Sequence, residues 1–379
     1  MGKPRIAIDI TAALGGASPG ISNYTRYLAL HLCAYQDEFD LLFYAHRQQL
    51  TSELLHSDVA AHFKRVRYPR QLFYPRGSHR GLLAIETLVG RIDLLHHPFG
   101  IAPHVRGGTL VLTVHDLIFM KRPEYHTPAT VRYFSKHVPQ SVARADKLIV
   151  PSATTKADLI ELLEVAPDKM EVISLGYDQS LYHPRSAVEI QAASNHWDIA
   201  FPYILFVGTI EPRKNVLNLV LAMRRVPDPY KLVVVGGKGW MYENVFRAVA
   251  DHHLQDRVHF LGFVPPEWVP PLLSGAEVFV YPSLHEGFGL PVLEAMACGA
   301  PVVASHIASL REVAGEAGVY ANPHEVEDLA AKINAILNDP DYASALRGRS
   351  LKQARKFSWT RMAAETVNVY RETLDYAFP

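Results

Sequence analysis

The sequence predicts an α/β protein made of two Rossmann-like, doubly wound domains. With 379 residues, the chain is longer than one ordinary hydrophobic core supports, which favours two domains. Short runs rich in branched aliphatic residues recur along the chain and alternate with segments of helical periodicity. These runs are apolar throughout, as is typical of parallel strands that helices cover on both faces.

Apolar runs in both halves predict the strands of two parallel sheets. Helical segments such as 21–32 separate the first runs, which lie at 5–11, 39–45, 63–68, 93–98, 109–116, 147–152 and 170–176. The second half repeats this plan with runs at 202–208, 230–237, 257–263, 276–283 and 300–305. Ligands bind beyond the carboxyl ends of strands in open parallel sheets, so we expect the two domains to face each other across a cleft.

A polar, proline-containing stretch at 175–202 lacks strand and helix periodicity, and we interpret it as the interdomain linker. The predicted domains are residues 1–180 and residues 181–359. Residues 358–378 have apolar positions at helical spacing and predict a terminal helix. The periodicity leaves open which domain this helix packs on.

The composition argues against some classes of partner and compartment. The 38 basic and 38 acidic residues give a formal net charge of zero, which argues against nucleic acid. Cys33 and Cys298 lie in apolar helical patterns without metal-ligand spacing, so we expect buried thiols in a reducing compartment. No signal peptide precedes the first strand, and no apolar stretch approaches the ~18 residues of a membrane span. We therefore expect a cytoplasmic protein, with attachment to the inner face of a membrane left open.

Residues 63–80 are basic and aromatic and include no acid. They fit a solvated loop, a contact with an acceptor that carries phosphate, or a contact with an anionic membrane surface. Nucleic acid is disfavoured here too, because no RNA- or DNA-binding signature is present. The sequence carries no indication of the oligomeric state.

The stretch YPSLHEGFGLPVLEAMACG, residues 281–299, predicts a strand, a tight turn and a helix. Pro291 suits the first helical position, which places Glu294 in the first helical turn and exposes Glu286 to Gly289 in the turn before it. Unpaired amides at a helix N-terminus can bind phosphate or sugar hydroxyls, and carboxylates accept hydrogen bonds from diols. The same pattern is common in α/β proteins, so a purely structural role is the alternative.

A glycine-containing loop follows the first predicted strand. Gly15, Gly16 and Gly20 precede a helix that we expect to begin near residue 21. Their spacing fits neither the dinucleotide fingerprint nor a P-loop. It indicates either a mobile loop that lets substrate approach backbone amides or a simple flexible turn.

Histidines end two other strands of the predicted first domain. His115 is placed to donate a hydrogen bond to a sugar hydroxyl, although structural histidines also end strands. His96 and His97 occupy a similar strand end, but no third ligand stands at fixed spacing. A metal site is therefore not expected there.

In the predicted second domain, Glu211 and Pro212 precede Arg213 and Lys214 at the start of a helix. Two cations oppose the dipole at a helix N-terminus, so a merely structural helix would gain nothing from them. A bound diphosphate would resolve this conflict, because arginine, lysine and helix amides all suit phosphate oxygens. Solvated surface residues are the alternative.

These motifs together resemble the retaining glycosyltransferases of family GT4, which have the GT-B fold, and are similar to bacterial mannosyltransferases of surface polysaccharide synthesis. The resemblance covers nearly the whole chain and rests on FVGTIEPRKN, TVHDL, RADKLIVPSATTKADL and YPSLHEGFGLPVLEAMACGAPVVAS. Its most specific part is the pair Glu286 and Glu294, which seven residues separate.

The resemblance implies that the second domain holds most of a nucleotide-sugar donor. Glu294 would bind the ribose diol. Glu286 and the backbone of Phe288, Gly289 and Leu290 would hold the donor sugar.

The resemblance also assigns the diphosphate to Arg213 and Lys214. Many relatives have arginine directly after the glycine that ends this strand, where this chain has Thr209. The diphosphate contacts are therefore expected to be shared differently from those of such relatives.

In the first domain, the resemblance implies that His115 contacts the sugar and that the loop with Gly15, Gly16 and Gly20 closes over the phosphates. It also implies that the terminal helix at 360–379 packs back on the first domain. The first domain would then bind the acceptor.

The implied chemistry is hexosyl transfer of the EC 2.4.1 type with retention of configuration. Negative charge develops on the leaving diphosphate, so fixed cations and amides are the main requirement. No DxD-type metal site is evident, and neither an essential metal nor a cofactor is expected. No carboxylate pair is placed for double displacement, so we expect front-face attack by a hydroxyl of a saccharide or lipid-linked acceptor.

GDP-mannose is the favoured donor, because the combination of HDL and EPRKN looks like bacterial mannosyltransferases. UDP-glucose, UDP-N-acetylglucosamine and deoxysugar nucleotides use the same motifs and are alternatives. A GT-B sugar-nucleotide epimerase and a non-catalytic nucleotide-sugar-binding subunit are further alternatives. A NAD-dependent dehydrogenase is disfavoured because the chain lacks the glycine fingerprint.

Overall fold

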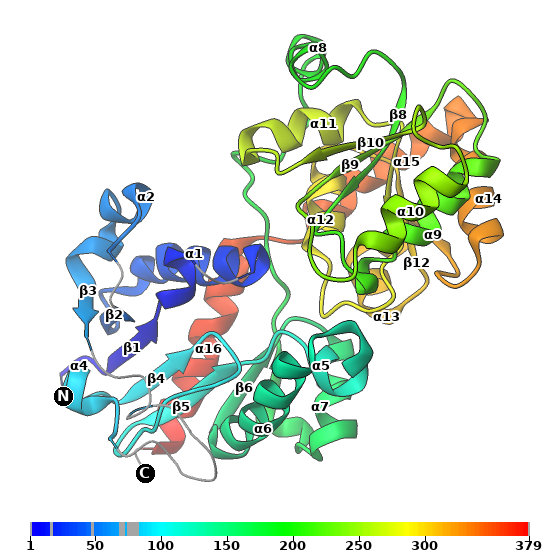
Figure 1. Ribbon diagram of the computed structural model, residues 1–379. Helices are drawn as coiled ribbons and strands as arrows, with labels where there is room; N and C mark the ends of the chain where they lie inside the picture. The colour runs from blue at the N-terminus through cyan, green and yellow to red at the C-terminus, as the bar shows by residue number, and fades with distance from the viewer. Residues whose placement is uncertain (1, 16–17, 47–48, 68–72, 74–82, 378–379) are drawn as a thin grey trace. The chain divides into compact units, whose positions relative to one another are not determined.

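A computed structural model of the chain describes residues 2–15, 18–46, 49–67, 73 and 83–377. The chain divides into two compact units (Figure 1). The N-terminal unit consists of Met1–Gly176 and Trp359–Pro379, and the C-terminal unit of Tyr177–Ser358. Each unit contains its own parallel sheet, which confirms the predicted fold class of two Rossmann-like domains.

The sheet of the N-terminal unit has the strand order β3-β2-β1-β4-β5-β6-β7, and neighbouring strands are parallel. The chain first builds outward from β1 to β3 and then returns to place β4 on the other side of β1. The point of reversal therefore lies between β1 and β4, where parallel sheets form ligand sites. The strands are β1 (Arg5–Asp9), β2 (Asp40–His46), β3 (Phe63–Val66), β4 (Leu94–His97), β5 (Thr109–Thr113), β6 (Lys147–Val150) and β7 (Met170–Val172).

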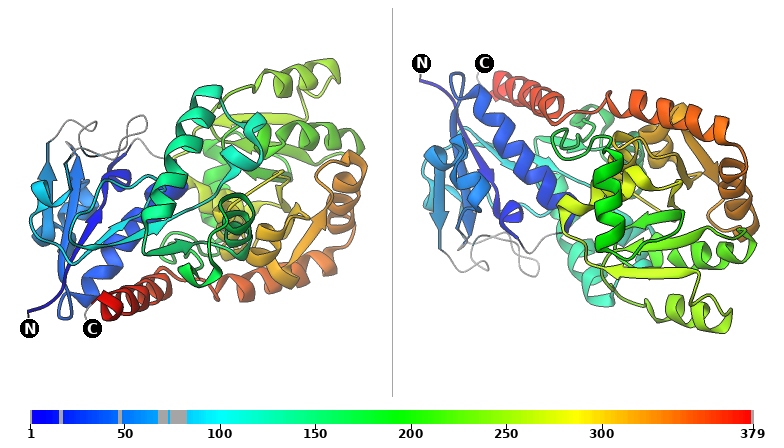
Figure 2. Two further views of the ribbon diagram at one scale, coloured as in Figure 1. Left: turned by 90° about the horizontal axis from the view of Figure 1, so that it is seen from below. Right: turned by 90° about the horizontal axis from the view of Figure 1, so that it is seen from above.

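Helices of this unit include the C-terminal helix, which packs against α1, β5 and β6 (Figure 2). An exposed ion pair between Arg371 and Glu38, 2.6 Å long, adds to this contact. The helices are α1 (Pro19–Leu32), α2 (Ser52–Leu55), α4 (Glu86–Val89), α5 (Ile118–Lys121), α6 (Pro128–Arg144), α7 (Ala153–Leu163) and α16 (Trp359–Ala377).

A buried chain of hydrogen bonds ties α16 to the sheet and to α1. The hydroxyl of Tyr370 lies 2.6 Å from Nδ1 of His96, and Nε2 of His96 lies 2.8 Å from Oγ1 of Thr113. The hydroxyl of Tyr24 is 2.9 Å from the same threonine oxygen. All four side chains are buried. Burial lowers the pKa of His96 to about 3, so its ring is neutral at physiological pH.

The sheet of the C-terminal unit has the order β10-β9-β8-β11-β12-β13, again parallel, with its reversal between β8 and β11. Its strands are β8 (Tyr203–Val207), β9 (Lys231–Val235), β10 (Val258–Gly262), β11 (Val278–Tyr281), β12 (Val302–Ser305) and β13 (Gly318–Ala321). Its helices are α8 (Ala187–His196), α9 (Val216–Ala222), α10 (Glu243–Asp251), α11 (Val269–Gly275), α12 (Leu290–Ala297), α13 (Ala308–Ala314), α14 (Val326–Leu337) and α15 (Pro340–Ala354).

Every apolar run predicted as a strand forms one, but β13 was not predicted and the predicted linker contains a helix. β13 is a short edge strand that is mostly half-buried, so it lacks a long apolar run. The predicted linker at 175–202 contains helix α8. Ser186 and Glu189 form a capping box at the start of this helix, and the helix packs on α11. Val188 of α8 is 78% exposed. The helix buries few apolar side chains, so its sequence shows little helical periodicity in apolar residues.

Two other expectations concern cysteines and membranes. Cys33 and Cys298 are buried free thiols, as predicted. None of the helices that the structure describes is both long enough and apolar enough to span a membrane. Residues 68–72 and 74–80 of the basic stretch at 63–80 lie outside the described residues, so its partner stays a prediction.

The buried contact of α16 generates a stability prediction. Tyr370→Phe removes the hydroxyl and leaves a ring nitrogen of His96 buried without this partner. We expect the free energy of unfolding to fall by about 1–3 kcal/mol, the usual cost of an unsatisfied buried polar group. Urea unfolding of the variant measures this loss. The control is Tyr133→Phe, at a tyrosine that is 46% exposed; equal losses in both variants would contradict the prediction.

Candidate functional site

In the C-terminal unit, the backbones of Gly208 and Gly236 lie in close contact just after the carboxyl ends of β8 and β9. Gly236 has a φ of +141°, and a Cβ atom built on it would lie 2.0 Å from the carbonyl oxygen of Gly208. Only glycine is compatible with this approach. The chain then passes through the exposed Thr209 toward the predicted phosphate-binding residues.

These residues lie in a single turn of 3-10 helix, Pro212–Lys214, ahead of α9. Asn215 follows in the left-handed conformation with a φ of +55°. Its side-chain amide donates to the carbonyl oxygens of Pro282 at 3.1 Å and Pro323 at 2.7 Å. The turn is thereby fixed next to the loop that follows β11.

Arg213, Lys214 and Glu286 meet in one buried cluster of charges. Glu286 accepts from Lys214 through Oε1 and from Arg213 through Oε2, each at 2.7 Å. Arg213 also pairs with Glu211 at 2.6 Å. Lys214 donates to the hydroxyl of Tyr281 and lies 4.7 Å from the centroid of that ring. The structure therefore brings together three of the predicted catalytic residues: Glu286 joins Arg213 and Lys214, although it lies more than 70 positions further along the sequence.

The cluster fixes the charge state of its carboxylate. Burial raises the pKa of Glu286, but the charges of Arg213 and Lys214 outweigh burial and lower it to about 2. Burial and the neighbouring Arg213 lower the pKa of Lys214, while Glu286 opposes them. Burial and the charge of Glu286 raise the pKa of Tyr281 well above 10, so its hydroxyl stays protonated.

Two arguments from the sequence are wrong here. The turn before α12 is not exposed, because Glu286 is only 8% exposed and Phe288 only 6%. The charges of Arg213 and Lys214 are not left unbalanced at a helix end, because Glu211 and Glu286 neutralise them. A bound diphosphate is thus not needed to explain why two cations occur at this position.

Helix α12 begins at Leu290, after Gly289, whose φ is +118°. A Cβ atom on Gly289 would lie 2.5 Å from Cδ2 of Leu310, so glycine is favoured by both conformation and space. Pro291 is therefore the second helical residue rather than the first. Glu294 is the fifth, one residue later than predicted, and no acid occupies the first turn of α12.

Glu294 has surroundings unlike those of Glu286. Burial raises its pKa from the ordinary 4.5 to about 8, and a hydrogen bond with Tyr182 opposes this only partly. Among the described residues no cation offsets the burial, so the carboxyl is mostly protonated at neutral pH. The hydrogen-bond partner Tyr182 comes from the stretch predicted as linker, where nothing in the sequence pattern marked it.

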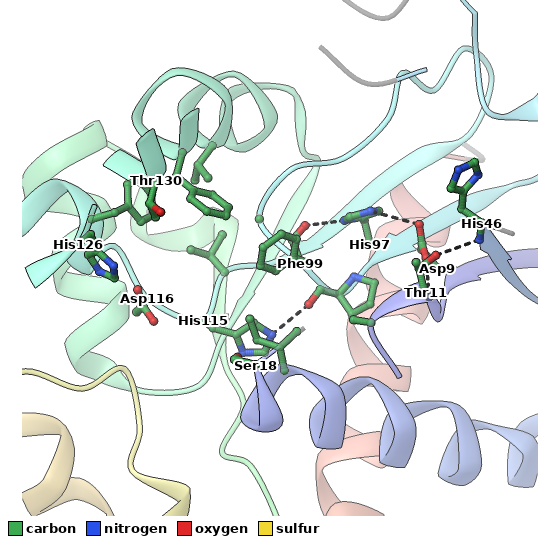
Figure 3. A pocket seen from close by; sticks show the side chains of 18 of the residues that line it. Asp9, Thr11, Ser18, His46, His97, Phe99, His115, Asp116, His126 and Thr130 are labelled. Atoms are coloured by element: carbon green, nitrogen blue, oxygen red, sulfur yellow. Dashed lines mark hydrogen bonds and ion pairs between the residues drawn. The ribbon is translucent and has the colours of Figure 1, made fainter. Parts of the chain in front are cut away.

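In the N-terminal unit, His115 and Gly15 line a cavity of about 660 Å³ (Figure 3). Burial lowers the pKa of His115, and its Nε2 lies 3.0 Å from the carbonyl oxygen of Pro98. In the neutral ring Nε2 must carry the proton to donate there, so Nδ1 is an acceptor. The prediction that His115 donates to a sugar hydroxyl is therefore reversed: in this tautomer its second nitrogen accepts.

The predicted glycine loop is described only in part. Gly15 has a φ of +116° and borders the cavity. Gly16 lies outside the described residues. Gly20 is not in the loop, because α1 already begins at Pro19.

The same cavity is lined by an aspartate–histidine pair that the sequence did not indicate as a site. Asp9 ends β1 and lies 3.5 Å from Nε2 of His97, which ends β4. In the sequence, His97 stands out only as a possible metal ligand without further ligands at fixed spacing. The rule that sites lie at strand ends, applied to β1, could have identified Asp9. Within the described residues, no group of three or more histidine, cysteine, aspartate or glutamate side chains is arranged to hold a metal ion, and metal independence stays a prediction.

The paired Rossmann-like units have the architecture of GT-B glycosyltransferases. Sucrose-phosphate synthase from Thermosynechococcus elongatus has a similar fold, with a TM-score of 0.77 and 22% identity over 99% of this chain and 100% of that one. Residues 19–181 match the family described as Glycosyltransferase Family 4, and residues 188–356 match Glycosyl transferases group 1. The chain belongs to glycosyltransferase family 4 and is a glycosyltransferase.

Relatives with higher identity occur in Escherichia coli. The chain is 36% identical over 283 residues to O-antigen chain mannosyltransferase B, which covers 73% of this chain and 74% of that protein. It is 32% identical over 261 residues to serotype-specific mannosyltransferase WbdA, which covers 67% of this chain. The match spans only 32% of WbdA, or about a third of its length.

The raised pKa of Glu294 predicts a pH-dependent stability. The folded state binds this proton more tightly than the unfolded chain, so the stabilisation is complete below about pH 4.5 and is lost as pH rises through about 8. Glu294→Gln has no carboxyl to ionise. We expect its melting temperature, relative to wild type, to increase between pH 5 and pH 9. Thermal unfolding without nucleotide measures this difference, and Glu267→Gln, at an exposed glutamate, is the control. A constant difference across pH would contradict the shift.

Proposed function

We propose that the protein is a retaining hexosyltransferase that moves mannose from GDP-mannose to a hydroxyl of a saccharide or lipid-linked acceptor. The buried cluster of Arg213, Lys214 and Glu286 carries this proposal. Two relatives that share 36% and 32% of their aligned residues with this chain are named mannosyltransferases. Their names support mannose as the sugar.

The donor would be held by the loops after β8 and β11. Glu286 would accept hydrogen bonds from sugar hydroxyls, and the backbone of Phe288, Gly289 and Leu290 would surround the sugar. Glu294 would bind the ribose diol. Because its carboxyl is mostly protonated without ligand, the two ribose hydroxyls would favour its ionised form and release a proton on binding.

Bond breaking places negative charge on the leaving diphosphate, which Arg213 and Lys214 would stabilise. Arginine offers a planar fork for two phosphate oxygens, and lysine a compact charge. Glu286 holds both cations in place before substrate arrives, so little reorganisation is required when the charge develops. Thr209, exposed beside this turn, supplies a hydroxyl where many relatives have arginine.

Retention would follow from front-face attack. A double displacement needs a carboxylate that can attack the sugar. Glu286 is a poor nucleophile, since two cations bind its oxygens and lower its pKa to about 2. The acceptor hydroxyl would instead attack from the side of the departing diphosphate and give its proton to the phosphate oxygen. Arg213 and Lys214 would act without an essential metal ion.

His115 would contact the donor sugar from the N-terminal unit, where its Nδ1 would accept a hydrogen bond from a sugar hydroxyl. Gly15 and its loop would close over the phosphates. A cytoplasmic location fits the use of a nucleotide sugar, and residues 63–80 are the candidate segment for contact with the inner face of a membrane.

A panel of GDP-, UDP-, ADP- and TDP-sugars tests the donor. Binding to the folded state raises the apparent stability by RT ln(1 + [L]/Kd), or about 2.7 kcal/mol at 100 times Kd. We expect GDP-mannose to raise the melting temperature most. Stabilisation by UDP-sugars but not by GDP-sugars would contradict GDP-mannose and identify a UDP-sugar as the donor. The anomeric configuration of the transferred sugar, measured by NMR, tests retention.

Variants of the two cations test the mechanism. Arg213→Ala and Lys214→Met are each expected to lower kcat by ~10² or more, because fixed donors that stabilise developing charge commonly have effects of this size. Arg225→Ala is the matched control, since Arg225 forms an ion pair with Glu327 on the exposed surface of the same unit. Circular dichroism verifies folding. Rates near wild type in both folded variants would exclude the mechanism.

A further inference from the structure

We propose that Tyr281 is a positioning residue for Lys214, and that its buried hydroxyl holds the lysine ammonium in place without neutralising it. This inference rests on the proposed transferase function, in which Lys214 stabilises the leaving diphosphate. Lys214 donates to the hydroxyl of Tyr281, and it donates to Oε1 of Glu286 at 2.7 Å. Two anchors on different residues fix an ammonium group that would otherwise move on a flexible side chain.

The strand order of the C-terminal sheet brings Tyr281 beside Lys214. Tyr281 is the last residue of β11, and Lys214 lies in the turn that follows β8. The two strands are neighbours at the reversal of strand order. The lysine therefore reaches the hydroxyl across the carboxyl ends of adjacent strands, where parallel sheets form ligand sites.

The ring of Tyr281 is held in place by its surroundings. The residue is 0% exposed. Its ring stacks with those of Phe206 and Phe279, and in each pair the centroids are 6.0 Å apart and the planes are 17° apart. Close packing leaves such a ring little freedom to move. The hydroxyl is therefore a fixed point for Lys214, whose Nζ also lies 4.7 Å from the ring centroid.

The hydroxyl is a neutral acceptor in a cluster whose charges already balance. Glu211 and Glu286 offset the two cations of the turn. A third carboxylate would add negative charge where the diphosphate is expected to bind. Burial, the charge of Glu286 and a hydrogen bond with it keep the pKa of Tyr281 well above 10. The tyrosine thus anchors the lysine and adds no negative charge to the site.

One N–H of the Lys214 ammonium is left for substrate. The group carries three N–H donors, of which Tyr281 and Glu286 accept two. None of the residues that the structure describes accepts the third. The two fixed bonds set its direction, because the bonds around an ammonium nitrogen are tetrahedral. A phosphate oxygen is the acceptor that we expect for it.

Tyr281→Phe tests this proposal on the full-length protein, because phenylalanine keeps the stacked ring and removes only the hydroxyl. We expect kcat to fall on the order of 10-fold, the effect of one lost hydrogen bond to a charged group. KM for the nucleotide sugar is expected to change by less than about twofold, since the anchored ammonium acts mainly on charge that develops in the transition state.

The matched control is Tyr203→Phe. Tyr203 is also buried in the C-terminal unit, at 3% exposed, but its hydroxyl donates to the backbone carbonyl of Leu272 at 2.8 Å. We expect this variant to lose stability in urea unfolding and to keep the wild-type kcat. Equal losses of kcat in Tyr281→Phe and Tyr203→Phe would overturn the proposal.

A double-mutant cycle shows whether Tyr281 acts through the lysine. If it does, Tyr281→Phe lowers kcat in the wild-type background but has no further effect in Lys214→Met. Losses that multiply, as expected of independent residues, would overturn the positioning role. Circular dichroism verifies that each variant is folded.

NMR of nitrogen-15-labelled lysine side chains tests the anchor without any nucleotide sugar. Loss of a signal in Lys214→Met assigns the ammonium of Lys214. In the wild type we expect this ammonium to be less mobile than that of the exposed Lys352, a comparison that needs no folded tyrosine variant. We also expect its signal to shift in Tyr281→Phe but not in Tyr203→Phe.

The NMR result separates the two ways in which the proposals can fail. A Lys214 ammonium as mobile as that of Lys352 would overturn the positioning role, even in an enzyme that transfers sugar. An ordered ammonium in a protein that turns over none of the nucleotide sugars would instead contradict the proposed transferase function.

Discussion

One carboxylate held between two cations is the interaction on which the C-terminal unit's site depends. Glu286 lies in the loop after β11, and Arg213 and Lys214 lie in the turn after β8. The two strands are neighbours in the sheet, so their loops begin side by side. Two further hydrogen bonds join these loops. The backbone N–H of Leu284 donates to the carbonyl oxygen of Arg213 at 2.8 Å, and the guanidinium of Arg213 donates to the carbonyl oxygen of His285 at 3.1 Å. Removing one partner would leave buried charge without compensation, which is far costlier than losing an exposed ion pair.

Both units place their polar groups by the same topological rule. Each parallel sheet reverses its strand order once, between β1 and β4 or between β8 and β11. At the first reversal lie Asp9 and His97, and at the second lie Lys214 and Glu286. The electrostatic outcomes differ: the C-terminal unit pairs Glu211 and Glu286 with Arg213 and Lys214, whereas the N-terminal cavity pairs an aspartate with a histidine. The first arrangement holds two cations against one carboxylate, and the described residues that line the second include neither lysine nor arginine.

The sequence predicted elements well where burial alone decides the pattern. Apolar runs located the strands because parallel strands are covered on both faces. It failed where few apolar residues are buried, as in α8 and the edge strand β13. The motifs also identified Arg213, Lys214 and Glu286, but not their mutual neutralisation, because a pairing between loops 70 residues apart depends on strand order. Tyr182, the partner of Glu294, was missed for the same reason: no local pattern marks a residue whose role depends on tertiary contact.

Helix α16 gives the chain an order of assembly. The N-terminal unit includes helix α16, although the whole C-terminal unit lies in sequence between α16 and the rest of the N-terminal unit. During synthesis the first unit emerges from the ribosome with β4 and β5 made, but without Tyr370 to cover His96. The C-terminal unit, in contrast, is continuous and can close as soon as its own residues are available. The N-terminal unit is therefore translated first but completed last. If translation stops before α16 is made, this unit lacks one of its helices.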